Sequence, residues 1–122
     1  MTALEILRVG ADFSHYAPLP PTFMRVSEAE YSSALISARK AAAVLREYGA
    51  VKVILFGSLA RKEDFEPRSD IDLAVWGIPS KLFFAAGARV MDLDSSHEIN
   101  IVDGATIPKG LHRSISKEGI PL

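Results

Sequence analysis

The sequence predicts an α/β (α+β) domain in which a small mixed sheet of about three strands is flanked by helices. Two observations lead to this prediction. Segments with apolar residues at helical spacing alternate along the chain with short runs rich in β-branched and aromatic residues. Glycine or proline separates most of these segments, as expected where a helix or strand ends and a turn begins.

Length and composition set the first limits. The chain has 122 residues, the size of one ordinary domain, and we divide it into an N-terminal arm (1–26) and a folded domain (27–122). Lys and Arg number 14 and Asp and Glu 15, so the net charge of −1 gives no electrostatic case for binding nucleic acid or a membrane. The absence of cysteine and of any signal-peptide pattern leads us to expect a cytoplasmic protein.

The N-terminal arm is the least regular part of the sequence. It carries Pro18, Pro20 and Pro21, which interrupt regular structure, together with aromatic side chains such as Phe13 and Phe23. We interpret it as an arm packed on the domain. The alternative is an arm that binds a partner protein.

The first half of the domain is predicted to be a helix followed by two strands. Ser27 and Glu30 form a capping box, apolar residues then recur at helical spacing, and Gly49 ends the helix. Residues 51–56 form a strand, and residues 59–69 form a short helical turn and a loop. Residues 70–76 alternate, with Ile71, Leu73 and Val75 on one face and Asp70, Asp72, Ala74 and Trp76 on the other.

The second half is predicted to continue with a helix, a strand and a helix. The helix covers residues 80–93, the strand 98–102, and the last helix 108–118, ended by Gly119. His15, His97 and His112 are interpreted as structural or exposed, because the three histidines show no metal-ligand spacing. Trp76 is expected to pack under a helix, with stacking on an adenine as the alternative.

Chemistry is concentrated between the first two strands. The first strand ends in Gly57-Ser58, where glycine allows a ligand to approach the backbone and the turn offers N–H and hydroxyl donors to a phosphate. The next strand carries Asp70 and Asp72 on one face, and two carboxylates so close repel each other unless a cation lies between them. Because Mg²⁺ prefers carboxylate and phosphate oxygens, the combination predicts a Mg-nucleotide site and nucleotidyl transfer.

The stretches Phe56-Gly57-Ser58-Leu59-Ala60-Arg61 and Ser69-Asp70-Ile71-Asp72-Leu73 resemble the DNA polymerase β nucleotidyltransferase superfamily, in its branch of minimal nucleotidyltransferases. The resemblance extends from about Val51 to the C-terminus. It implies a polymerase β-like nucleotidyltransferase fold. It also implies that Gly57 and Ser58 hold the triphosphate of ATP and that Asp70 and Asp72 hold Mg²⁺. Arg61 and Ser69 are further candidate nucleotide-binding residues, and the alternative for Arg61 is a solvated surface arginine.

The resemblance also identifies a departure from the family pattern. Members of the family carry a third acidic residue on the following strand, and the matching position here is Asn100. An asparagine offers an oxygen to a metal but cannot act as a general base. Glu98, two residues earlier on the same face, is a candidate substitute.

The resemblance implies an enzyme and a partner. Minimal nucleotidyltransferases commonly pair with a HEPN-domain toxin, and some transfer AMP from ATP to a tyrosine of that partner, acting as its antitoxin. The alternative is an antitoxin with an impaired active site that neutralises its partner by binding alone. A small-molecule adenylyltransferase is a third reading, weaker because such enzymes use an extra domain to enclose the substrate. We also expect a homodimer or a complex with the partner.

Overall fold

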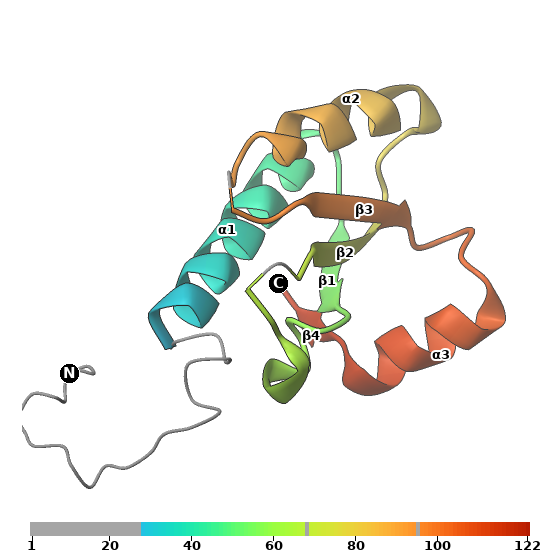
Figure 1. The fold of residues 1–122 in the computed structure, drawn as a ribbon. Coiled ribbons are helices and arrows are strands. Elements are labelled where there is room, and N and C mark those ends of the chain that lie inside the picture. The colour runs from blue at the N-terminus through green and yellow to red at the C-terminus, as the bar shows by residue number, and fades with distance from the viewer. Residues whose placement is uncertain (1–27, 68, 95) are drawn as a thin grey trace, which may run out of the picture.

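The computed structural model describes residues 28–67, 69–94 and 96–122 (Figure 1). The described residues form three α-helices, a short 3₁₀ helix and four strands. They are α1 (Glu28–Glu47), β1 (Lys52–Phe56), the 3₁₀ helix (Lys62–Asp64), β2 (Ile71–Trp76), α2 (Ser80–Met91), β3 (Ile99–Asp103), α3 (Lys109–Glu118) and β4 (Ile120–Pro121).

The strands form one mixed sheet in the order β3-β2-β1-β4. β1 is antiparallel to β2 and to β4, whereas β2 and β3 are parallel and are joined by α2, since parallel neighbours need a crossover connection. This register places Asp72 of β2 between Phe56 of β1 and Asn100 of β3. The predicted site residues thus converge where β1 ends and β2 and β3 begin.

One face of the sheet carries the main hydrophobic core. Ile71, Leu73 and Val75 point to this face and are fully buried against α1 and α2, which lie together on one side of the sheet (Figure 1). The buried stripe of α1 consists largely of small residues, which let the helix approach the sheet closely: Ala34, Ser37, Ala38, Ala41, Ala42 and Leu45.

The opposite face carries α3 and a smaller core. Ile54, Ala74 and Ile115 form its buried centre, and Trp76 and Leu111 pack against them. The smaller core covers only part of this face. Asp72 belongs to the same face by strand alternation and is only half-buried. A polar site beside α3 is therefore open to ligands.

The predicted elements are confirmed, with bounds that differ by one or two residues. The sheet has one strand more than the about three predicted, because the two-residue β4 pairs with Ile54 and Leu55 of β1. The capping box at Ser27 and the arm over residues 1–26 lie outside the described residues. Among the described residues, no helix is long and apolar enough to cross a membrane.

Candidate active site

The turn after β1 depends on the backbone conformation of its glycine. Gly57 has φ +80°, a backbone conformation that favours glycine, and its carbonyl accepts hydrogen bonds from the N–H groups of Ala60 at 3.1 Å and Arg61 at 3.2 Å. Among the described residues, no carbonyl accepts from the N–H groups of Ser58 and Leu59. Ser58 is partly exposed whereas Leu59 is fully buried, so the turn offers the backbone N–H of Ser58 to an incoming anion.

The same glycine lies against the predicted metal ligand. A Cβ atom added at Gly57 would lie 2.6 Å from Oδ2 of Asp72, which is closer than real Cβ contacts. The absence of a side chain is therefore what allows the turn after β1 and the carboxylate to be neighbours. The structure brings Gly57, Ser58 and Asp72 together as the sequence predicted.

Three polar side chains meet beside this turn. Asp72 is the second residue of β2, Asp70 immediately precedes that strand, and Asn100 is the register partner of Asp72 on β3. Nδ2 of Asn100 donates to Oδ2 of Asp70 over 3.1 Å. Asn100 thus occupies the expected third position, and its amide bridges toward both carboxylates.

The surroundings of Asp72 disfavour its charged form. Burial raises the pKa of Asp72, the hydrogen bond from Asn100 acts against this rise, and the charge of Asp70 adds to it. Among the described side chains, no lysine or arginine forms an ion pair with either aspartate. Within residues 28–67, 69–94 and 96–122, the two carboxylates are therefore held together without a cationic side chain.

These residues fit a magnesium ion. Two carboxylates on one face, with an amide oxygen available after a side-chain flip and an adjoining donor-rich turn for phosphates, are the donor types that Mg²⁺ and a nucleotide require. The carboxylate of Glu98 does not join them, because no three His, Asp or Glu side chains within the described ranges are grouped to hold a metal. Its role as the substitute acid remains a prediction.

Arg61 and Ser69 both make contacts within the protein. Nε of Arg61 contacts Oδ2 of Asp64 at 2.8 Å, and its Nη1 contacts Oε1 of Glu118 at 3.2 Å, so the guanidinium is already paired. The hydroxyl of Ser69 accepts from the N–H of Glu66 over 2.9 Å and thereby shapes the loop before Asp70. Their contacts with nucleotide remain predictions.

Sequence reasoning missed the residues that hold this loop in place. His97 is buried, and its Nδ1–H donates to the carbonyl of Ser69 over 2.8 Å. Asp94 in turn accepts from the N–H groups of Ser96 and His97 through Oδ1, and from the hydroxyl of Ser37 on α1 through Oδ2 at 2.7 Å. An aspartate often accepts a hydrogen bond from the backbone two residues later in a turn, and this pattern could have predicted the contact between Asp94 and the N–H of Ser96.

Trp76 packs as predicted. Its ring lies in the smaller core, where a Cβ atom added at Gly104 would come within 2.1 Å of Cε2 of the indole. Nζ of Lys52 lies 4.6 Å from the ring centroid on the exposed side. The indole is therefore part of the α3 layer.

Comparison with known proteins agrees with this geometry. Residues 39–122 match the family described as polymerase beta, nucleotidyltransferase. No curated protein sequence matches the chain.

Two solved structures share the fold. One is a mutant of the toxin–antitoxin MntA-HpeT, at 17% identity over 68% of this chain and 69% of that chain, with a TM-score of 0.56. The other is a toxin–antitoxin with AMP-PNP, at 16% identity over 70% of this chain and 69% of that chain, with a TM-score of 0.54. Together with the sequence match, which covers more than half of the chain, the site geometry leads to one conclusion: this protein belongs to the polymerase β nucleotidyltransferase family.

Proposed function

We propose that the protein is a Mg²⁺-dependent nucleotidyltransferase that transfers AMP from ATP to a hydroxyl, in the first instance a tyrosine, of a partner HEPN-domain toxin, and so acts as its antitoxin. One observation carries the proposal. The donor-rich turn at Gly57 and Ser58 adjoins a carboxylate pair, Asp70 and Asp72, that has no cationic partner among the described residues. Similar folds in two toxin–antitoxin structures, one of them with AMP-PNP, support the choice of partner and nucleotide.

The residues of the site would have separate roles in an in-line transfer of AMP. Asp70 and Asp72 would hold Mg²⁺, and the turn at Gly57 and Ser58 would hold the β- and γ-phosphates. The ion, when bound, offsets the charge that develops on the phosphate oxygens.

The acceptor oxygen forms its bond to the α-phosphorus while the bond from that phosphorus to the β-phosphate bridging oxygen breaks. Pyrophosphate leaves with the electron pair. The hydroxyl proton leaves to solvent, since the amide of Asn100 cannot accept it as a base.

The test is the intact mass of the partner. The protein encoded beside this chain is co-expressed with it, purified and weighed by mass spectrometry. A matched control carries Asp70→Asn and Asp72→Asn, which keep the side-chain size and remove both charges. The expected result is one added AMP with the unmutated protein and none with the control. Equal masses in both samples would refute transfer.

A second candidate is favoured by Asn100. An antitoxin that acts by binding alone has no need of a third carboxylate, and this chain places an amide there. Co-purification without added mass would support this reading. Asn100→Asp then discriminates further. If the site is impaired only by the missing acid, the variant gains transfer, whereas a pure binding module gains none and shows no Mg²⁺-dependent ATP binding by calorimetry.

A further inference from the structure

The outer edge of the sheet next to the active site is unpaired. β3 is the last strand in the order β3-β2-β1-β4, so within the described part of the chain its outer row of backbone N–H and C=O groups faces no other strand. Such an edge can pair with an extended segment from another chain.

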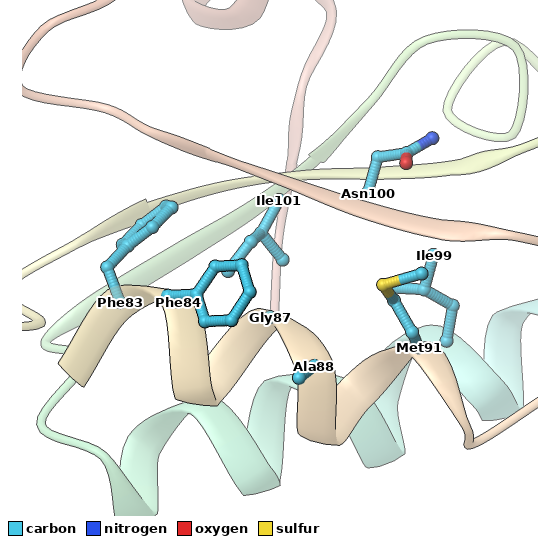
Figure 2. Close-up of a pocket in the computed structure, with 8 residues that line it drawn as sticks. All are labelled: Phe83, Phe84, Gly87, Ala88, Met91, Ile99, Asn100 and Ile101. Atoms are coloured by element: carbon cyan, nitrogen blue, oxygen red, sulfur yellow. The ribbon is translucent and has the colours of Figure 1, made fainter.

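A groove of about 260 Å³ runs along this edge, between β3 and α2. Figure 2 shows Phe84 rising from α2 toward Ile101 and Met91 rising beside Ile99, while Asn100 points to the opposite side of the strand. Phe84 is 86% exposed and Met91 53% exposed, although both are large apolar side chains. The apolar groove and the active site are therefore the two sides of one strand.

The geometry of an in-line transfer indicates that the acceptor hydroxyl approaches from the β3 edge. In an in-line transfer, the attacking oxygen and the leaving pyrophosphate lie on opposite sides of the α-phosphorus. The turn at Gly57 and Ser58 follows Phe56, which faces Asp72 from β1, whereas Asn100 faces it from β3. With the leaving phosphates on the β1 side, the hydroxyl arrives from the β3 side. This step rests on the proposed function.

We infer that the acceptor segment of the partner protein binds as an extended strand along the outer edge of β3. Successive side chains of a strand point to opposite faces. A hydroxyl residue opposite Asn100 has its Cβ atom about 4.5–5.5 Å from that of Asn100 and shares its face with Asp72. The residues before and after it then point into the groove against Phe84 and Met91. The substrate class is therefore a tyrosine between two large apolar residues.

The test uses two synthetic peptides and ATP labelled at the α-phosphate. One peptide carries a tyrosine flanked on each side by isoleucine, with terminal lysines for solubility, and the other has aspartate in place of each isoleucine. The KM for the isoleucine peptide is expected to be at least tenfold lower. Phe84→Lys should remove this preference. The matched control Val51→Lys, at a residue 79% exposed and away from the groove, should keep it.

Calorimetry with Mg²⁺ and ATP, without peptide, separates the possible failures. If neither is bound, the proposed function falls, and the inference falls with it. If both are bound, equal KM values for the peptides, transfer to neither, or no effect of Phe84→Lys would overturn the inference alone. A change from dimer to monomer in Phe84→Lys by sedimentation, with an unchanged KM, would assign the groove to a second copy and overturn it also.

Discussion

Replacing one hydrogen with a methyl group has opposite effects at two glycines of this chain. Gly57 has φ +80°, and its added Cβ would lie 2.6 Å from Oδ2 of Asp72. Gly110, in the first turn of α3, has no atom within 4 Å of its added Cβ. Gly57→Ala is therefore expected to destabilise the fold and to displace a carboxylate, whereas Gly110→Ala is expected to do neither.

The size of the two effects follows from the backbone and the contact. An L-residue in the left-handed region costs roughly 1–2 kcal/mol, and moving Asp72 off its rotamer costs a further 0.5–1.5 kcal/mol or so. The lower entropy of the unfolded chain offsets about 0.4–1 kcal/mol of this. We expect Gly57→Ala to lose about 1–2 kcal/mol, and Gly110→Ala to gain about 0.5 kcal/mol from helix propensity.

Thermal unfolding followed by circular dichroism measures the stability of both variants. For a domain of this size, 1 kcal/mol corresponds to roughly 3–6 °C in Tm. Calorimetric titration then measures the binding of Mg²⁺ and ATP, which the Gly57→Ala variant should lose and the Gly110→Ala variant should keep. A Gly57→Ala protein as stable as the Gly110→Ala protein, with normal nucleotide binding, would refute the placement of this glycine against Asp72.

Three further predictions follow from other contacts. Burial raises the pKa of Asp72 from 3.8, so its stabilising contribution is full below pH 3.8 and is lost as pH rises through the folded pKa. Asp72→Asn should therefore raise Tm at pH 7.5 without metal, an advantage that shrinks toward pH 4. Mg²⁺ should then stabilise only the unmutated protein. Burial opposes the shift, but hydrogen bonds lower the pKa of Asp94 on balance. Asp94→Ala should therefore lose about 1–2 kcal/mol at neutral pH, and this deficit should shrink as pH falls from 3.8 through the lower pKa of the folded state; a deficit that does not shrink in acid would contradict this. Gly104→Ala should cost about 1–3 kcal/mol and shift the emission of Trp76, the one tryptophan of the chain, whereas ATP should leave that emission unchanged if the indole packs rather than stacks.

The elements that were predictable are those whose pattern is local. Alternation over residues 70–76 assigned Ile71 to the core and Asp72 to the opposite face, as the structure places them. β4 was not predictable, because two residues contain no alternation to detect. It exists through pairing with Ile54 and Leu55 and through the hydrogen bond from the Leu122 N–H to the Val53 carbonyl.

In the candidate site too, some contacts follow from the local sequence and others do not. Gly57, Asp70 and Asp72 lie within sixteen consecutive residues, and the turn between two adjacent strands brings them together. Arg61 lies in the same stretch, yet its guanidinium is paired with Glu118, 57 residues further along the chain. A contact over such a distance depends on how α3 packs against β1, which no local pattern encodes.

Asn100 connects the stability of the site to its chemistry. Its amide donates to Asp70 and lowers the pKa of Asp72, so it acts against the repulsion between the two carboxylates. An acid at this position would add a third negative charge to the same face, and without a metal the folded state would carry its full cost. The asparagine therefore makes the metal-free site easier to maintain, while it withdraws the group that would accept a proton from the attacking hydroxyl. In the proposed function, Asp70, Asp72 and Gly57 are the groups that would bind the nucleotide, and the chain keeps them together although their close arrangement is individually unfavourable. In that function, the residue at the third position would set the rate of transfer, because it decides whether the hydroxyl proton has an acceptor.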